Sequence, residues 1–397
     1  MKISEYKAGQ FQHQKDLSGF DLRFSSFLPH LINLEWNIDS PLIQTLLSEA
    51  DLKLGELNAF SQLIPDIDFY IRMHQILEAT QSNRIEGTQT SIEEALQKKE
   101  DLPPEKRDDW EEVHNYIEAM NQSIEDLKKL PISTRLICQS HKILLQGVRG
   151  RDKLPGEFRK SQNWIGGTSL KDAIFIPPPH TYVNELMSDL ENFLHNKDIF
   201  VPHLIKIALI HYQFETIHPF LDGNGRMGRL LITLYLVANN LLNVPSLYLS
   251  DFFERNRTLY YDNLDRVRQL NDLQQWIKFF LIGVKETAEN SINIFKNIIK
   301  LKEKTENKIV TSINNKAKVK KSLELLHYLY KNPFVSINGV SLILDISIPT
   351  AIRFITDFQS IGILEEITNL KRNRMFVFLD YYKLFPETTY KTQKMLI

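Results

Sequence analysis

The chain has 397 residues, of which 43% are hydrophobic and 24% are charged, and its formal net charge is −1. This composition excludes a mainly disordered chain, and the length is enough for two or three hydrophobic cores. The charge excludes a global field that would attract nucleic acid or an acidic membrane.

The single cysteine, Cys138, excludes an internal disulfide and a multi-cysteine metal site. The N terminus lacks an apolar signal core, and Asn239 and Asn240 interrupt the most apolar stretch before it reaches membrane-spanning length. We therefore expect a cytoplasmic protein with no membrane partner.

The first 145 residues carry apolar side chains at helical spacing. This spacing predicts helix after helix, without regular strands, over residues 42–54, 69–86, 92–99, 109–128 and 134–145. Ser91 followed by Glu94 has the spacing of a capping box, which marks the start of the third of these helices.

The segment 149–180 interrupts the helical pattern. Its glycines and prolines surround a short stretch at 158–165, and they are Gly150, Pro155, Gly156, Gly166, Gly167, Pro177, Pro178 and Pro179. This composition predicts an irregular flap or β-hairpin inserted in a helical domain. Long inserted loops are more often functional than structural.

A glycine-rich turn joins two apolar helices, one predicted at 204–214 and one beginning near residue 225. Gly223 and Gly225 tolerate backbone angles that let consecutive N–H groups converge on one anion at the start of the second helix. Arg226 and Arg229 share one face of its first turns, where the macrodipole disfavours cations unless an anion is bound. The pattern therefore predicts a phosphate site.

Two side chains before the turn add chemistry to this site. Asp222 is a hard oxygen ligand of the kind that suits the Mg²⁺ accompanying a nucleoside triphosphate. His218 is the group in this segment that can accept a proton near neutral pH. A bare Gly-Asn-Gly is common in ordinary loops, but these residue types in fixed order across twelve positions are specific.

The segment resembles the signature of the Fic family of protein adenylyltransferases, H-x-F-x-[DE]-G-N-G-R-x-x-R. Every specified position is met, by His218, Phe220, Asp222, Gly223, Asn224, Gly225, Arg226 and Arg229. The resemblance extends to residues of about 30 to 100, to the flap and to the C-terminal region, so it covers most of the chain. It implies a mainly α fold, with a Fic-type helical core, a β-hairpin flap and a C-terminal winged-helix domain.

The resemblance also implies an activity, namely transfer of AMP from ATP to a Tyr, Ser or Thr hydroxyl of a protein, including this protein itself. His218 would act as the general base, and Asp222 would hold Mg²⁺ between the α- and β-phosphates. The phosphates would be bound by Gly223, Asn224, Gly225, Arg226, Met227, Gly228 and Arg229.

The resemblance implies roles for two further sets of residues. The flap near Trp164, Ile165 and Gly166 would cover the nucleotide and hold the target segment by strand pairing, a mode that suits many substrates because it uses the main chain. Tyr260 and Tyr261 would lie near the adenine. The alternative for this tyrosine pair is helix packing with one ring exposed.

A second motif suggests a built-in inhibitor. Gly87 suits the left-handed end of the helix that contains Ser82, which leaves Glu86 at the negative end of a helix dipole, where an acid needs a nearby cation. The run 82–87 matches the family's inhibitory motif, [ST]-x-x-x-E-[GN], so the resemblance implies that Glu86 pairs with Arg229 and makes ATP bind unproductively. Whether Glu86 also orients a water that removes AMP is open.

The C-terminal part carries three predicted helices and two strand-like runs, at 323–330, 340–344, 349–360, 364–368 and 375–379. This order is the layout of a winged helix. Ser347 and Pro349 begin the third helix, whose inward face should hold Ala351, Ile352, Ile355 and Phe358 and whose outward face should hold Thr350, Arg353 and Asp357. The hairpin tip carries Lys371, Arg372 and Arg374.

We therefore divide the chain into an N-terminal helical region with the inhibitory helix (1–105), a Fic core with flap (106–290), a lysine-rich linker helix (291–322) and a winged-helix domain (323–397). A basic wing suits DNA, although winged helices also serve protein contact. The alternatives are a DNA-binding regulator whose Fic domain only senses nucleotide, and an enzyme that transfers another phosphate-containing group. A homodimer is one assembly left open.

Overall fold

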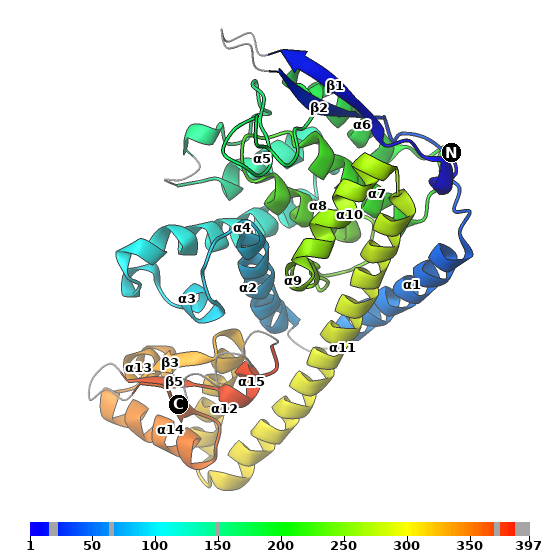
Figure 1. Cartoon of the computed structure of the whole chain (residues 1–397). Helices are drawn as coiled ribbons and strands as arrows, with labels where there is room; N and C mark the ends of the chain where they lie inside the picture. Colours follow the sequence, from blue (N-terminus) through cyan, green and yellow to red (C-terminus); the bar gives the residue numbers. More distant parts are fainter. Residues whose placement is uncertain (16–22, 63–66, 148–150, 369–373, 386–397) are drawn as a thin grey trace. The chain divides into compact units, whose positions relative to one another are not determined.

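The computed structural model describes residues 1–15, 23–62, 67–147, 151–368 and 374–385. The chain is mainly α-helical with two small sheets (Figure 1). It divides into two compact units: unit 1 comprises Met1–Asn58 and Ile76–Ala288, and unit 2 comprises Ala59–Gln75 and Glu289–Ile397. The boundaries expected at residues 105, 290 and 322 stay a prediction.

The N-terminal region, where the predicted helices begin only at residue 42, starts with a β-hairpin that the sequence did not predict. After the 3₁₀ turn η1 (Ile3–Glu5), β1 (Gly9–Lys15) pairs antiparallel with β2 (Arg23–Pro29). Phe11 stacks edge-on against Phe27 across the hairpin at 5.1 Å, and Phe27 is buried. Cross-strand aromatic pairs of this kind stabilise two strands whose alternation is too short to stand out in the sequence.

The five helices predicted before residue 145 are all present. They are α1 (Pro41–Gln62), α2 (Ile67–Ile85), α3 (Ile92–Leu96), α4 (Arg107–Asp126) and α5 (Thr134–Leu144). The capping box of α3 is also confirmed, because the Glu94 N–H donates to Ser91 Oγ at 3.3 Å and the Ser91 N–H donates to Glu94 Oε2 at 3.0 Å. Short 3₁₀ turns follow at Lys99–Asp101, Pro104–Lys106, Arg151–Lys153 and His180–Tyr182.

Two helices form the centre of unit 1 (Figure 1). All residues of α7 (His203–Ile217) from Leu204 onward are buried, as are those of α8 (Asn224–Ala238) up to Leu236. Helices that are apolar on all sides bury all their faces. Their neighbours include α4, α5 and α6 (Val183–His195), and the later helices are α9 (Ser250–Arg255), α10 (Arg257–Leu270) and α11 (Leu273–Ser312). The glycine-rich turn between α7 and α8 is therefore anchored in the core.

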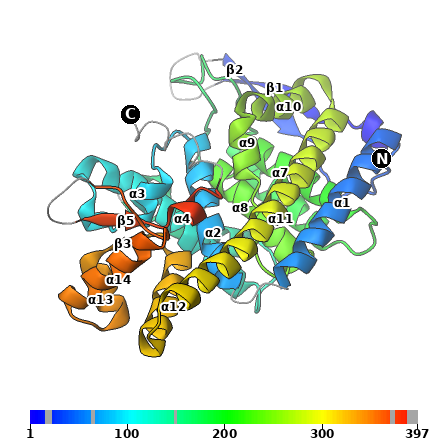
Figure 2. The same cartoon turned by 90° about the horizontal axis from the view of Figure 1, so that it is seen from below.

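In unit 2 three helices pack with a three-stranded antiparallel sheet of order β3-β5-β4 (Figure 2). The elements are α12 (Lys316–Lys331), β3 (Phe334–Ser336), α13 (Ile337–Leu344), α14 (Ile348–Ser360), β4 (Glu365–Glu366), β5 (Met375–Val377) and α15 (Leu379–Tyr382). The residues of the linker helix predicted at 291–322 lie in α11, which continues without a break to Ser312, and in α12, which begins after Asn315, whose side chain caps it. The linker assignment stays a prediction. The winged-helix assignment stays a prediction.

The inward face of α14 differs from the prediction at one residue. Ile352, assigned to the inward face, is 43% exposed, and Phe354 is buried in its place because 351, 354, 355 and 358 follow the helical period. Arg374 pairs with Glu366, with Nε 2.7 Å from Oε1. Lys371 and Arg372 lie outside the described residues. DNA binding stays a prediction.

No individual helix in the described ranges has the length and apolar character needed to cross a bilayer, and the bent pair α13 and α14 meets that test only when the two are taken together.

Candidate active site

The backbone of the turn between α7 and α8 takes two left-handed residues. His218 ends α7 with φ 51° and ψ 60°, and its N–H donates to the Phe214 carbonyl at 2.9 Å. Gly223 precedes α8 with φ 75°. A left-handed conformation is ordinary for glycine but costs a residue with a β-carbon about 1–2 kcal/mol, so the surroundings must hold His218 in place.

Polar side chains fill the inside of this turn. Asn224 accepts a hydrogen bond from the Phe220 N–H at 2.8 Å and donates to the Phe220 carbonyl at 2.9 Å. His141 of α5 stacks on Phe220 with ring centroids 3.6 Å apart. Its Nδ1 accepts from the Gly156 N–H, so Nε2 carries the proton that is donated to the Asp222 carbonyl, each at 2.9 Å. These contacts give His141 a structural role in the turn.

The N terminus of α8 has no side-chain cap, because its N-cap residue is Gly223. Uncapped first-turn N–H groups form an anion site. The carboxylate of Glu86 lies close to the first turn of α8, since a β-carbon added to Gly225 would lie 2.1 Å from Glu86 Oε1. Gly225 is therefore needed for the close approach of this carboxylate to the helix.

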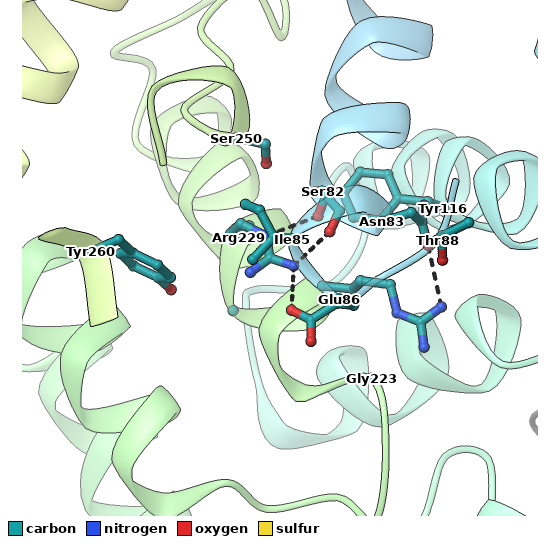
Figure 3. A network of polar contacts seen from close by, with 12 residues as sticks. Ser82, Asn83, Ile85, Glu86, Thr88, Tyr116, Gly223, Arg229, Ser250 and Tyr260 are labelled. Carbon is teal, nitrogen blue, oxygen red and sulfur yellow. Dashed lines mark hydrogen bonds and ion pairs between the residues drawn. The ribbon is translucent and has the colours of Figure 1, made fainter. Parts of the chain in front are cut away.

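Arg229 is bound on three sides by the end of α2 (Figure 3). Its Nε donates to Ser82 Oγ at 2.9 Å, and its Nη2 donates to the Ser82 carbonyl at 2.9 Å and to Glu86 Oε1 at 2.7 Å. The predicted pairing of Glu86 with Arg229 is thus confirmed. Gly87 has φ 102°, as expected of the residue that ends this helix. Burial opposes ionisation of Glu86, but the Arg229 guanidinium holds the pKa of this carboxyl below its ordinary value.

Arg226 faces a second set of partners that the sequence did not reveal. Its Nη1 lies 3.3 Å from both Asn83 Oδ1 of α2 and Glu112 Oε2 of α4, and its Nη2 lies 3.5 Å from Asp222 Oδ1. Within the described part of the chain its Nε has no hydrogen-bond partner, although the atom is buried. Arg226 thus retains one donor for a ligand.

The His218 imidazole is held neutral. Burial lowers its pKa to about 4; Glu86 opposes the shift, while Arg159 and Arg268 add to it. Its buried Nδ1 has no hydrogen-bond partner among the residues that the structure describes. A neutral imidazole can accept a proton at neutral pH, as a general base must.

One more titratable group lies beside the site. Glu215 of α7 is buried, and a β-carbon added to Gly228 would lie 2.2 Å from its Oε1. Burial raises the pKa of Glu215 to about 7; Glu86 adds to the shift, while Arg229 and Arg268 oppose it. Gly228 therefore serves the close approach of α7 to α8.

Asp222 is the candidate Mg²⁺ ligand. Its side chain is 44% exposed, and Oδ1 accepts a hydrogen bond from the Gly223 N–H at 2.6 Å. No cluster of three or more His, Cys, Asp or Glu side chains suited to a metal occurs within the described ranges. One carboxylate fits Mg²⁺, which is commonly bound through one or two carboxylates, substrate phosphates and water.

The flap is a loop with a single antiparallel bridge, which is the irregular form of the two that the sequence left open. Ile165 and Phe175 form an isolated antiparallel bridge, with the Ile165 N–H 2.8 Å from the Phe175 carbonyl. Gly166 has φ 69°, and Trp164 is 39% exposed. Arg149 and Gly150, at the start of the predicted flap, lie outside the described residues.

The N-terminal hairpin supports the flap. The Phe27 N–H donates to the Ile176 carbonyl at 2.9 Å, so β2 lies directly beside the end of the flap. A cavity of about 490 Å³ is lined by both segments, with Phe11 and Phe24 on one side and Ile174 and Phe175 on the other.

Two of the residues assigned to the nucleotide, Met227 and Tyr260, are packed in the core, whereas Tyr261 is exposed. The Met227 side chain is completely buried, and its N–H donates to the Gly223 carbonyl. Tyr260 is 1% exposed and its hydroxyl bonds to His211 Nε2 at 2.9 Å, whereas Tyr261 is 40% exposed. The tyrosines therefore match the packing alternative with one ring exposed, and only Tyr261 is open to a ligand.

Comparison with known proteins agrees with this geometry. Residues 44–125 match the Fic/DOC family N-terminal model, and residues 131–236 match the Fic/DOC family model. A protein of Aquifex aeolicus named as a probable protein adenylyltransferase is 30% identical over 227 residues, covering 55% of this chain and 65% of the relative. The protein adenylyltransferase Fic of Aedes aegypti is 31% identical over 141 residues, covering 35% of this chain and 25% of the relative.

Solved structures share the fold. A Fic family protein from Desulfovibrio desulfuricans G20 has a TM-score of 0.53 at 20% identity, covering 86% of this chain and 97% of the other. A Fic domain-containing signaling protein from Bacteroides thetaiotaomicron has a TM-score of 0.50 at 19% identity, covering 64% and 96%. With the complete signature at 218–229, the chain therefore carries a Fic/DOC family N-terminal region at 44–125 and a Fic/DOC family domain at 131–236.

Proposed function

We propose that this chain transfers AMP from ATP to a Tyr, Ser or Thr hydroxyl of a protein, including itself. The observation that carries the proposal is the turn between α7 and α8, where the neutral imidazole of His218, the uncapped start of α8 and two buried arginines converge. The names of the relatives support the same reaction, although they are matched over only 65% and 25% of their lengths.

In the proposed reaction His218 removes the proton from the target hydroxyl, and the oxygen attacks the α-phosphorus of ATP. The bond from that phosphorus to the bridging oxygen breaks, and pyrophosphate leaves. The α8 N–H groups and Arg226 stabilise the developing charge, because oriented donors in a buried site are worth more than in water. Asp222 would hold Mg²⁺, which supplies charge neutralisation between the α- and β-phosphates when bound.

We further propose that Glu86 inhibits the resting enzyme. Its carboxylate lies against Gly225 and is paired with Arg229, so it takes both a phosphate position and the cation that a γ-phosphate would need. The target would bind along the flap, whose single bridge leaves main-chain groups available for strand pairing. Removal of AMP with Glu86 orienting a water is a further expectation of the same site.

The test is incubation of the purified chain with ATP labelled at either the α- or the γ-phosphate. Protein-bound label from the α position alone supports AMP transfer, and γ label means phosphorylation instead. If neither label is retained by the Glu86→Gly variant with Mg²⁺, the proposal is wrong and a nucleotide-sensing role takes its place. His218→Ala in the same background is the matched control and should retain no label.

A further inference from the structure

The left-handed turn at His218 is held by a residue outside the signature. Arg159, at the base of the flap, is only 2% exposed. Its Nε donates to the His218 carbonyl at 2.9 Å, and its Nη2 donates to the Ile217 carbonyl at 3.2 Å. Its own N–H donates to the Pro219 carbonyl at 2.9 Å. One residue therefore binds three consecutive carbonyls at the end of α7.

The same guanidinium also binds the flap. Nη1 donates to the Ser161 carbonyl at 3.2 Å, and Nη2 donates to the Pro178 carbonyl at 2.6 Å. Asn163 assists, because its Nδ2 lies 3.2 Å from the His218 carbonyl and 2.9 Å from the Phe220 carbonyl. Across the described ranges, no carboxylate forms an ion pair with Arg159. A buried cation whose partners are all carbonyls is costly, so a simple structural ion pair does not explain it.

We propose that Arg159 is a positioning residue for the reaction, which holds the His218 turn in its left-handed conformation and couples that turn to both ends of the flap. The planar guanidinium group of Arg159 suits this task, since it presents several hydrogen-bond donors in a fixed geometry. The last carbonyls of a helix lack partners within the helix, and a cation there also meets the negative end of the dipole. The effect on catalysis rests on the proposed AMP transfer, but the effect on His218 does not.

The charges around His218 agree with this assignment. The groups that act on the His218 ring are Glu86, which follows α2, Arg159 of the flap, Arg268 of α10 and the backbone of Glu215 on α7. Burial lowers the pKa of His218, Glu86 opposes that shift, and Arg159 is the larger of the two arginine contributions that add to it. Loss of Arg159 should therefore raise the pKa of His218 while the neighbouring carboxylate remains.

The kinetic test uses Glu86→Gly as the parent and compares Arg159→Gln, Arg159→Lys and Arg268→Gln. Arg268 is the matched control, because it is a buried arginine that covers the Phe175 ring at 3.8 Å and bonds Thr216, with no bond to His218. We expect both Arg159 variants to lower kcat by roughly 10–100-fold, the range for a misplaced catalytic group, with the KM for ATP changed less than about threefold. The loss in Arg268→Gln should be at least about tenfold smaller.

The second readout needs no activity. In the otherwise unaltered chain, NMR titration of the His218 ring, assigned with His218→Gln, should give a higher pKa in Arg159→Gln and a smaller change in Arg159→Lys. An unchanged pKa in Arg159→Gln, or a kcat loss no larger than that of Arg268→Gln, overturns the proposal. Thermal melts of the variants distinguish misfolding from a change in position. Asn163→Ala, which removes two bonds to the same turn, serves as a second variant for this comparison. An inactive Glu86→Gly parent would refute AMP transfer and leave the titration as the deciding measurement.

Discussion

Replacing Glu86 by glutamine should release Arg229 without removing side-chain volume. In the structure the two groups are 2.7 Å apart, with the Arg229 side chain 1% exposed and the Glu86 side chain 35% exposed. A hydrogen bond to a charged group contributes about 1.5–3 kcal/mol when buried, and an exposed ion pair contributes about 0–1 kcal/mol. For this half-exposed pair we take about 1.5 kcal/mol.

That free energy corresponds to about a tenfold change in a binding constant. Because Glu86 and the γ-phosphate would compete for Arg229, Glu86→Gln should bind ATP about tenfold more tightly than the unaltered chain. Without ATP the variant leaves Arg229 with Ser82 as partner, so its unfolding temperature should fall. Saturating ATP should restore that temperature by mass action.

The assays are calorimetric titration with ATP and Mg²⁺, and the rate of self-labelling from α-labelled ATP. Glu118→Gln, an exposed glutamate on α4, is the matched control and should change neither. The pKa of Glu86 is lowered, so the pair is fully formed above the ordinary carboxyl value and is lost only as the pH falls through the lowered pKa. Glu86 should therefore stay ionised from pH 6 to 9, so its own titration should not change the contrast between the variants in this range. Equal ATP affinities and equal labelling rates for Glu86→Gln and the unaltered chain would refute the competition.

We make three further predictions, two for the buried Glu215 and His211 and one for the half-exposed Asp222. The pKa of Glu215 is raised to about 7, so the free energy of unfolding should fall by up to about 3 kcal/mol as the pH rises from the ordinary carboxyl value to 7. Denaturant titrations of Glu215→Gln should lack this fall. Identical pH profiles for the variant and the unaltered chain would contradict the prediction. His211→Leu leaves the Gly228 carbonyl and the Tyr260 hydroxyl without their His211 partner, so the free energy of unfolding should fall by about 2–4 kcal/mol in denaturant titrations. A fall of less than about 1 kcal/mol would show that these bonds contribute little to stability. Asp222→Asn should raise the Mg²⁺ concentration for half-maximal labelling about tenfold or more, whereas an unchanged requirement would exclude Asp222 as the ligand.

The helices and the signature were predictable because their signals are local. Apolar spacing, caps and turn residues act within a few positions, so α1 to α5 and the capping box at Ser91 were found where expected. The pairing of Glu86 with Arg229 was also predicted, although 143 residues separate them, because resemblance named the motif and a helix dipole left the acid in need of a cation.

Tertiary structure alone decided which side chains complete the site. Arg159 lies 59 residues before His218, and Glu112 lies 114 residues before Arg226, and neither pair has a spacing that a local pattern could reveal. The sequence by itself predicted the candidate reacting groups at 218–229, since their order along the chain reflects one turn between two helices. What holds and surrounds those groups depends on burial and on contacts between distant segments. Both arise only when the N-terminal hairpin, the flap and α2 pack within unit 1, because a buried polar group must find its partners wherever the fold brings them.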